Sequence, residues 1–333
     1  PNQGAKMSKQ STVSHIPGPP PVGEYATVAF LGPFGTFTEQ AVWKVAPAGA
    51  ELLPVSSAGL ALDMVRQGEA DRAVVPIENS IEGGVNATID ALARDGNLMI
   101  VAEMLVPIRF FLAAPEGMEL KDVTRIGTHP HAWAQCREWV RKNLPDAVHV
   151  PTTSTAAGAE LLSGTEPNAE GLTLDAALCN ETSVSRYGLT ALARDVADNP
   201  DAVTRFVMVS RIGKVPPATG ADKTTIQVKL PNDRSGALLT MLEQFSARGV
   251  NLSRIESRPS GDGLGHYAFS IDIAGHVSEE RVQAALSGLH RTCPQVLFLG
   301  SYPRVDGERA QIQKGTSDHE FLEARNWVQS LLV

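Results

Sequence analysis

The stretch Asn199-Pro-Asp-Ala-Val-Thr-Arg-Phe-Val-Met-Val-Ser210 joins a turn to a run of apolar, largely β-branched residues. Its second half has the composition of a buried strand. Thr204 and Arg205 stand where the turn enters that strand. A hydroxyl donor beside a permanent cation suits a site that holds and protonates an anion. On spacing alone, an equally good explanation is that Arg205 pairs with an internal carboxylate and Thr204 fills the strand.

The composition indicates a globular protein with more than one domain. The 333 residues carry a formal net charge of −8 and are 43% hydrophobic, which predicts two or three domains with sizeable cores. An acidic chain with few aromatic residues is not typical of nucleic-acid-binding proteins. No apolar run reaches the roughly 18 residues of a membrane helix, so no membrane partner is expected.

The N-terminal segment and the cysteines indicate the cellular setting. Residues 1–24 are rich in Pro, Gly and Ser and lack the apolar core of a signal peptide, so we expect a disordered leader. The three cysteines, Cys136, Cys179 and Cys293, are widely spaced and form no metal-binding pattern. This spacing favours a reduced, cytoplasmic setting and no metal site.

Three loops of small polar residues each follow an apolar strand and precede a helix. They are Gly32-Pro-Phe-Gly-Thr36, Glu78-Asn-Ser80 and Thr152-Thr-Ser-Thr155. In open α/β sheets, ligands bind outside the carboxyl ends of the strands, where such loops lie. Backbone N–H groups and hydroxyls at these ends attract carboxylates or phosphates. The first loop lacks the GxGxxG spacing, which disfavours a dinucleotide site, and a plain strand-to-helix turn remains its alternative explanation.

Two histidines stand at the start of a predicted helix that runs to about Asn143. Pro130 lies between His129 and His131 and fits a first helical turn. Histidine titrates near neutral pH and suits acid–base chemistry, but at a helix entry it more often caps or packs. We therefore expect these two side chains to cap or pack rather than to catalyse.

The pattern changes after a linker rich in Pro and Gly at residues 215–220. Strands and helices then follow in the order βαββαβ over about 80 residues, which is the order of a ferredoxin-like module. The tail from residue 304 is polar, except for a short amphipathic pattern at 321–333, to which we assign no function. The expected elements of the module are strands at 224–230, 252–259, 267–273 and 295–299 and helices at 235–247 and 278–289.

The run Thr204-Arg205-Phe206 resembles the Thr-Arg-Phe signature of prephenate dehydratases. The likeness extends from about Val28 to about Ser301. Members of this family convert prephenate to phenylpyruvate, with loss of water and CO2, in phenylalanine biosynthesis. The resemblance therefore implies a hydro-lyase that needs neither a metal nor an organic cofactor. Further matching motifs are Gly-Pro-x-Gly-Thr at 32–36, Pro-Ile-Glu-Asn-Ser at 76–80 and Ser-Thr-Ala-Ala at 154–157.

The resemblance also implies a fold. It is an α/β fold with a two-lobed, periplasmic-binding-protein-like catalytic domain and an α+β, ferredoxin-like ACT regulatory domain. The chain is expected to cross between the lobes near Glu103–Pro107. The implied segments are a leader at 1–24, a catalytic domain at 25–213 (lobe 1 at about 25–104 and 190–213, lobe 2 at about 105–189), a linker at 214–222, the ACT domain at 223–303 and a tail at 304–333.

By the same resemblance, Thr204, Arg205 and Phe206 are catalytic. Thr204 would donate a proton or a hydrogen bond to the departing hydroxyl, Arg205 would clamp a carboxylate, and Phe206 would exclude water. The family often has Asn where this chain has Ala202, and whether Asn199 replaces that side chain stays open. The implied substrate-binding residues are Gly35, Thr36, Asn79, Ser80, Thr153, Ser154 and Thr155.

Two segments of the C-terminal module resemble the phenylalanine-binding motifs of the family. Without the resemblance, the first is an ordinary helix start, and the second is the end of an edge strand, where Pro is tolerated. The resemblance implies L-phenylalanine as an allosteric effector, bound at a subunit interface of a homodimer or homotetramer. The implied effector-binding residues are Gly236, Ala237, Leu238, Leu239, Glu256, Ser257, Arg258 and Pro259.

Three other functions fit parts of the sequence. Arogenate dehydratase is the nearest, because arogenate differs from prephenate only by an amine in place of a ketone, and no single residue decides between them. A non-catalytic amino-acid sensor would use the cleft and the ACT-like module only to bind. A transport binding protein shares the two-lobed fold, but the missing signal peptide and the added module count against it.

Overall fold

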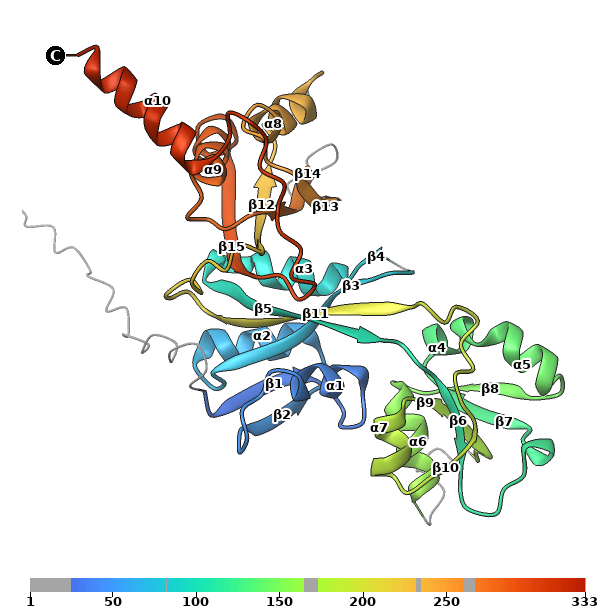
Figure 1. Cartoon of the computed structure of the whole chain (residues 1–333). Coiled ribbons are helices and arrows are strands. Elements are labelled where there is room, and N and C mark those ends of the chain that lie inside the picture. Colours follow the sequence, from blue (N-terminus) through green and yellow to red (C-terminus); the bar gives the residue numbers. More distant parts are fainter. Residues whose placement is uncertain (1–24, 82, 165–172, 232–234, 260–266, 333) are drawn as a thin grey trace, which may run out of the picture.

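The structure is a computed structural model that describes residues 25–81, 83–164, 173–231, 235–259 and 267–332. The disordered leader expected at 1–24 lies outside these residues. Three β-sheets with helices around them form two α/β lobes and an α+β module, which confirms the predicted fold class. In Figure 1 the C-terminal module lies at the top, lobe 1 in the middle and lobe 2 at the lower right.

Lobe 1 is built on a sheet with the strand order β2-β1-β3-β11-β5, and β4 pairs with β3. Strand β11 contains Val203 to Ser210, the apolar part of the stretch that begins at Asn199, and runs antiparallel between β3 and β5. Its seven interior residues are all buried, as the apolar run predicts. The elements of this lobe are β1 (Thr27–Leu31), α1 (Phe37–Trp43), β2 (Glu51–Val55), α2 (Ala58–Gln67), β3 (Arg72–Asn79), β4 (Gly83–Gly84), α3 (Asn86–Ala93), the 3-10 helix η1 (Arg94–Gly96), β5 (Leu98–Pro107) and β11 (Val203–Arg211).

Lobe 2 is built on a second sheet with the order β10-β6-β9-β7-β8. The chain enters this lobe after Pro107, where β5 ends. After β10 ends at Ala193, it still packs in the core of this lobe at Val196 and Ala202. One predicted helix is wrong, because Cys136 has φ −117° and ψ 9°, which divides it into α4 and α5. The elements are β6 (Phe111–Ala114), the 3-10 helix η2 (Leu120–Asp122), β7 (Arg125–Thr128), α4 (Pro130–Gln135), α5 (Arg137–Asn143), β8 (Val148–Pro151), α6 (Thr155–Ser163), β9 (Ala176–Cys179), α7 (Glu181–Arg186) and β10 (Thr190–Ala193).

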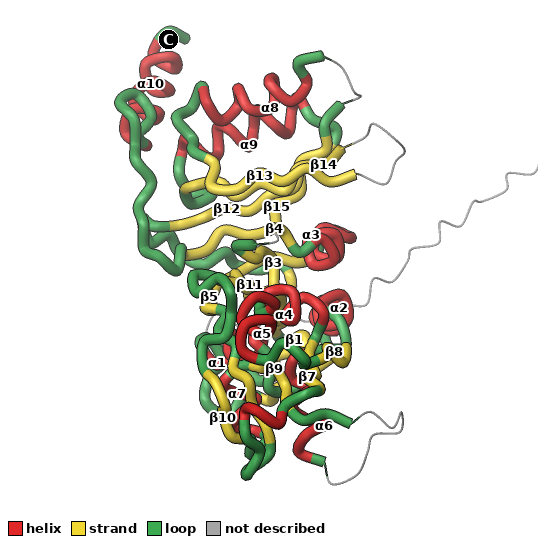
Figure 2. The backbone as a smooth tube through the Cα atoms, turned by 90° about the vertical axis from the view of Figure 1, so that its right-hand side faces the viewer, coloured by secondary structure: helices red, strands yellow, loops and turns green. Residues whose placement is uncertain are grey.

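The C-terminal module has the predicted βαββαβ order and a sheet arranged β13-β14-β12-β15. Helices α8 and α9 cover one face of this sheet, and the other face is turned toward lobe 1 (Figure 2). Helix α10 follows in the tail, at the position of the amphipathic pattern. The elements are β12 (Asp222–Lys229), α8 (Ala237–Ser246), β13 (Leu252–Pro259), β14 (Tyr267–Ala274), α9 (Glu280–Thr292), β15 (Gln295–Pro303) and α10 (Asp318–Ser330).

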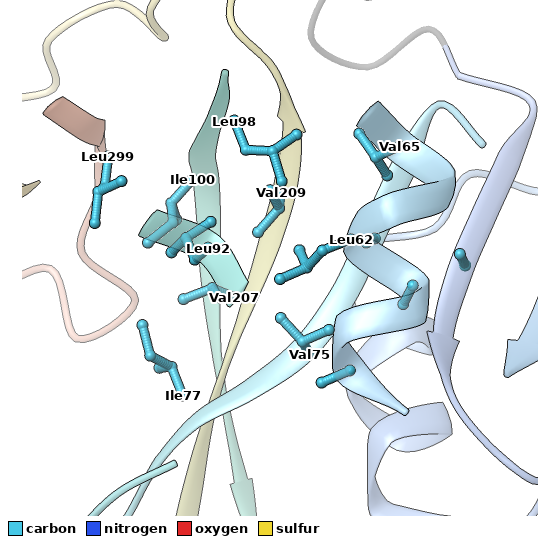
Figure 3. Packing of buried hydrophobic residues seen from close by; sticks show 14 of the residues in the cluster. Leu62, Val65, Val75, Ile77, Leu92, Leu98, Ile100, Val207, Val209 and Leu299 are labelled. Carbon is cyan, nitrogen blue, oxygen red and sulfur yellow. The ribbon is translucent and has the colours of Figure 1, made fainter. Parts of the chain in front are cut away.

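The module and lobe 1 share a hydrophobic core. Leu299 and Tyr302 of β15 are buried in the same cluster as Ile100 and Val207 of lobe 1 (Figure 3 shows Leu299 facing this cluster). The two backbones also approach closely: a Cβ added at Gly300, where φ is 128°, would lie 2.2 Å from the Ile100 carbonyl oxygen. Burial of apolar surface on both sides of the junction fixes the module against the lobe that carries β11.

Candidate active site

A cavity of about 940 Å³ lies between the two lobes. Side chains from strand ends and from the loops that follow them line it, as expected for an α/β fold with a cleft. The predicted site residues that line the cavity are Thr36, Asn79, Thr153, Ser154, Thr155, Thr204 and Phe206.

Thr204 and Asn79 form a hydrogen-bonded pair on the lobe 1 wall of the cavity. The two residues face each other across β11 and β3, and the Asn79 Nδ2 group donates to the Thr204 hydroxyl oxygen at 2.9 Å. The Asn79 Oδ1 atom accepts from the Ile81 backbone N–H at 2.8 Å, which fixes the orientation of the amide. Because the Thr204 oxygen accepts from Asn79, its own proton remains available for donation, and Thr204 lines the cavity.

Phe206 lies on the same face of β11 as Thr204, because side chains two residues apart in a strand share a face. It lines the cavity together with Pro76 of β3 and Phe110 of lobe 2. These apolar side chains stand beside the hydroxyl of Thr204. The cavity therefore has an apolar wall with one oriented donor.

The loop between β1 and α1 contributes Thr36 but not Gly35 to the lining. Thr36 is the N-cap of α1 and accepts from the Glu39 backbone N–H. Gly35 has φ 89°, a left-handed conformation that favours glycine. Its N–H donates to the Glu39 carboxylate at 2.5 Å, and its carbonyl accepts from the Ser183 hydroxyl at 2.7 Å. Gly35 thus shapes the loop and does not offer these groups to a ligand in the cavity.

Helix α6 presents its N-terminus at the lobe 2 wall. Ser154 is the N-cap, and its hydroxyl accepts from the Ala157 N–H at 2.9 Å. The adjacent Thr153 and Thr155 also line the cavity. The helix packs closely on β7, since a Cβ at Gly158 would lie 2.8 Å from the Gly127 carbonyl oxygen. Hydroxyls at the positive end of a nine-residue helix favour an anionic ligand.

Contacts from α7 join the two lobes at one side of the cavity. Tyr187, just after α7, donates its hydroxyl proton to the Phe34 carbonyl at 3.1 Å. The Arg186 guanidinium pairs with the fully buried Glu39 carboxylate and lies 4.7 Å from the centre of the Phe34 ring. The Gln40 side chain also donates to Thr182 at 3.0 Å. The sequence analysis missed these residues, because nothing in the local pattern links α1 to a helix about 140 residues later.

Both histidines at the start of α4 line the cavity. The rings of His129 and His131 lie 5.1 Å apart, and His129 caps α4 by accepting from the His131 N–H at 3.2 Å. Within the described part of the chain, no Lys or Arg lines the cavity, and one carboxylate, that of Glu160, does. A dianionic ligand would therefore be bound by hydroxyl, amide and imidazole groups and by a helix N-terminus, at a distance from Glu160.

The structure places Arg205 and Ser80 outside the cavity lining. Arg205 follows Thr204 in the strand and therefore points to the opposite face of the sheet. Its guanidinium is buried against Glu103 and Asp272. The prediction that Arg205 clamps a substrate carboxylate in the cavity is therefore wrong in its geometry. Ser80 instead accepts from the Val203 N–H at 2.9 Å and joins β3 to β11.

The position where the family often has Asn is not filled by Asn199. Ala202 is buried in the core of lobe 2, and its carbonyl accepts from the Ile108 N–H at 2.8 Å. Asn199 uses its Oδ1 atom to accept from the Asp201 N–H at 2.9 Å within the turn. It is not among the residues that line the cavity.

The predicted effector residues lie on two elements of the C-terminal module. Gly236 has φ 83° and begins α8, whose Leu238 and Leu239 are exposed. On β13, Arg258 donates to Asp90 of α3 at 2.6 Å. Glu256 accepts from Arg254 at 3.3 Å. The remaining members of the two motifs are Ala237, which is buried, and Ser257 and Pro259, which are exposed.

In the described part of the chain, no group of three or more His, Cys, Asp or Glu side chains is placed to hold a metal ion. None of the helices in that part combines the length and the apolar character needed to cross a membrane. Cys136, Cys179 and Cys293 are free thiols.

Comparison with known proteins gives consistent matches over most of the chain. The family model of prephenate dehydratase matches residues 28–214, and that of the ACT domain matches residues 224–291. A prephenate dehydratase from Amycolatopsis methanolica is 42% identical over 305 residues, which cover 91% of this chain and 97% of the relative.

Two solved structures have similar folds. The prephenate dehydratase from Arthrobacter aurescens, solved in complex with L-Phe, is 54% identical with a TM-score of 0.86, and the match covers 92% of this chain and 99% of that one. A protein described as GqqA, a novel type of quorum quenching acylase, is 29% identical with a TM-score of 0.73, and the match covers 83% and 97% of the two chains.

Proposed function

This chain belongs to the prephenate dehydratase family, and from that premise we propose that its interlobe cavity binds prephenate and converts it to phenylpyruvate. The observation that carries this assignment of the site is the Thr204–Asn79 pair, which presents an oriented hydroxyl to the cavity from within the Thr-Arg-Phe motif. The reaction removes the ring hydroxyl and the ring carboxylate together.

Prephenate is a dianion, with one carboxylate on the ring and one on the pyruvyl side chain. Both of these groups are attached to one ring carbon, and the ring hydroxyl is on the opposite carbon. The hydroxyls of Thr153 and Thr155 line the lobe 2 wall of the cavity, and that of Thr204 lines the lobe 1 wall. This arrangement fits binding of the carboxylate-bearing end by lobe 2 and of the hydroxyl end by Thr204, whereas the Thr36 hydroxyl already donates to the Leu31 carbonyl at 3.3 Å. The α6 N-terminus adds a favourable field at the lobe 2 end. Arg205 takes no part in this binding.

In the proposed chemistry, the bond between the ring carbon and the carboxylate breaks, and its electron pair enters the ring. In the same step the bond to the ring hydroxyl breaks at the opposite carbon, and its electrons leave with the oxygen. Thr204 donates its proton to that oxygen, so CO2, water and the aromatic product form with uptake of one proton from solvent. Aromatisation drives the reaction, and acid assistance of this kind is typically worth about 10²–10⁴-fold.

The apolar wall makes the proton donation more effective. Phe206, Pro76 and Phe110 line the same cavity as Thr204, and a ring packed on them excludes water. Electrostatic and hydrogen-bond interactions are stronger in a site from which water is excluded. Asn79 keeps the Thr204 oxygen in the acceptor role, so the proton remains directed at the substrate.

We further infer that L-phenylalanine acts as an effector through the C-terminal module. The ACT match over residues 224–291 and the relative solved with L-Phe support this inference. The two proposed contacts are the start of α8 at Gly236–Leu239 and the end of β13 at Glu256–Pro259. Because Leu238 and Leu239 are exposed and β13 is an edge strand, a second copy of the chain would complete the site in a homodimer or homotetramer. A cytoplasmic location fits the free thiols.

One assay separates this function from its rivals. The purified chain is given prephenate and, separately, arogenate, and the release of phenylpyruvate or phenylalanine is measured. We expect turnover with prephenate and a lower kcat/KM with arogenate. A higher kcat/KM with arogenate would show that the chain is an arogenate dehydratase. Binding of prephenate without turnover would indicate a non-catalytic sensor. The fold shared with an acylase does not decide the reaction, because one fold hosts many activities.

A further inference from the structure

Arg205 lies at the centre of a buried polar network that joins lobe 1 to the C-terminal module. Its Nε group donates to Glu103 of β5 at 2.7 Å. Its Nη1 group donates to Asp272 of β14 at 2.5 Å, and its Nη2 group donates to the Tyr302 hydroxyl of β15 at 2.8 Å. The side chains of Arg205, Glu103 and Asp272 are 6%, 2% and 0% exposed. Figure 1 shows the lower end of β15 beside β5 of lobe 1.

The module holds its own members of the network in place. Asp272 also accepts from the Thr225 hydroxyl at 2.7 Å and from the Arg254 Nε group at 3.1 Å. Lys223 donates to Glu103 at 2.9 Å. A buried charge is tolerated only when it is paired and hydrogen-bonded. These partners therefore make the position of the Arg205 guanidinium depend on the module as well as on lobe 1.

The same guanidinium reaches the strand that carries Asn79. Arg205 faces Glu78 across β11 and β3, and its Nη1 group donates to the Glu78 carboxylate at 3.4 Å. The next pair in one direction is Thr204 with Asn79. On the other side, Phe206 pairs with Pro76. Two successive residues of β11, Arg205 and Phe206, therefore pair with residues of β3 that are two positions apart, so β3 has one extra residue in a bulge. Bulges re-aim the side chains beside them, and this one lies directly beside the proposed proton donor.

We propose that Arg205 is a positioning residue for the dehydratase reaction: by joining Glu78 and Glu103 to Asp272 of the C-terminal module, it holds the bulge that sets the Thr204–Asn79 pair. This inference rests on the proposed function of the cavity. It gives the second residue of the Thr-Arg-Phe motif a role on the face of the sheet that turns away from the substrate. It also makes the C-terminal module part of the support of the active site.

The chemistry of arginine suits this role. Its planar guanidinium directs several N–H donors at once, and here they reach three carboxylates and a phenol. Lysine has one flexible point charge and cannot reproduce that geometry. A displacement of about 1 Å at a reacting group costs on the order of 10²-fold in rate. Arg205→Lys keeps the positive charge but cannot make all of these hydrogen bonds at once. It should therefore lower kcat by about 10- to 100-fold and leave KM nearly unchanged.

A double-mutant cycle tests whether Arg205 acts through the Thr204–Asn79 pair. The kcat of prephenate turnover is measured for the wild-type chain, Arg205→Lys, Asn79→Ala and the double variant. If Arg205 positions this pair, its replacement lowers kcat far less once Asn79 is absent. Equal losses in the two backgrounds, within about twofold, would mean independent effects and would overturn the proposal.

The matched control is Asp90→Asn, which breaks the ion pair of α3 with Arg258 at the same module interface and touches neither β11 nor the cavity. We expect its kcat to stay within about twofold of wild type. If Arg205→Lys fails to fold, Tyr302→Phe removes one donor–acceptor contact and keeps the ring. A selective loss of kcat in this variant supports the proposal, and an unchanged kcat contradicts it.

A second readout does not depend on turnover. In crystal structures of the wild-type and Arg205→Lys chains, the distance between Asn79 Nδ2 and the Thr204 oxygen, 2.9 Å here, should lengthen beyond hydrogen-bonding range in the variant. An unchanged distance would overturn the proposal even if the chain used another substrate. The opposite result is also informative. If the wild-type chain does not turn over prephenate but the distance still lengthens in Arg205→Lys, the proposed function is contradicted and the positioning role of Arg205 is not.

Discussion

Replacing Glu39 with glutamine perturbs the contact between the two lobes at one point. The Glu39 carboxylate is fully buried. It accepts from the Gly35 N–H at 2.5 Å and from the Trp43 indole at 3.3 Å, and it pairs with Arg186 of lobe 2. Glutamine has nearly the same shape and keeps one acceptor, so the change removes the charge with little loss of packing.

The magnitude follows from the two strongest of these bonds. A hydrogen bond to a charged group contributes about 1.5–3 kcal/mol and a neutral one about 0.5–1.5 kcal/mol. The glutamine amide can accept at only one of the two carboxylate oxygen positions, so it weakens one of the Gly35 and Arg186 bonds and loses the other, which costs about 2–3 kcal/mol. The lower desolvation of a neutral amide offsets part of this, which leaves about 2 kcal/mol. The substitution therefore destabilises the Gly32–Thr36 loop and the closed arrangement of the two lobes.

Two assays measure this effect. Urea unfolding should show a decrease of about 2 kcal/mol in the free energy of unfolding, and KM for prephenate should rise about tenfold, with a smaller change in kcat. Gln40→Ala is the matched control, because it removes the neutral hydrogen bond to Thr182 between the same two lobes. We expect it to lower the free energy of unfolding by less than about 1 kcal/mol. Unchanged stability and KM in Glu39→Gln would refute the role given to this contact.

Three further predictions concern the module junction and the buried ionisable groups. Gly300→Ala places a Cβ 2.2 Å from the Ile100 carbonyl oxygen at φ 128°, so it should lower the free energy of unfolding by about 2–5 kcal/mol in urea titration; an unchanged value would contradict the shared core. Burial raises the pKa of Asp272, but the charges of Arg205 and Arg254 outweigh it and leave this pKa below its usual value. The stability from Asp272 is therefore complete above its unfolded pKa of about 3.9 and is lost as the pH falls below that, so unfolding measured from pH 5 to 2 should depend less steeply on pH in Asp272→Asn; equal slopes would contradict this. Burial raises the pKa of the Cys179 thiol to about 12 and also raises that of Cys136, so a thiol reagent at pH 8 should modify neither in the native chain and both after unfolding; rapid modification of the native chain would count against the buried positions.

The sequence predicts the parts of the site that depend on local patterns. Thr204 and Asn79 could be placed at strand ends because apolar runs stop there, and the Ser154 cap could be recognised from the small helical residues after it. The alternation of side chains along a strand also contains the information that Thr204 and Arg205 point to opposite faces. Treating the two as neighbours in one pocket overlooked that alternation.

Long-range pairing could not be predicted in the same way. Asp272 lies 67 residues after Arg205, in another domain, and no periodicity indicates which strand faces β11. The contacts of Arg186 and Tyr187 with the loop before α1 also depend on how the lobes close. The break at Cys136 was missed because its flanking residues favour one continuous helix, and tertiary packing overrides that local preference.

The most direct test of the account is the kcat of prephenate turnover in Thr204→Val compared with Thr204→Ser. Valine keeps the branched shape in the strand and removes the hydroxyl, whereas serine keeps the hydroxyl beside Asn79. We predict that valine lowers kcat by about 10²–10⁴-fold with a much smaller change in KM, and that serine retains activity within about tenfold of wild type. A Thr204→Val chain that is folded and keeps the wild-type kcat would contradict proton donation by Thr204.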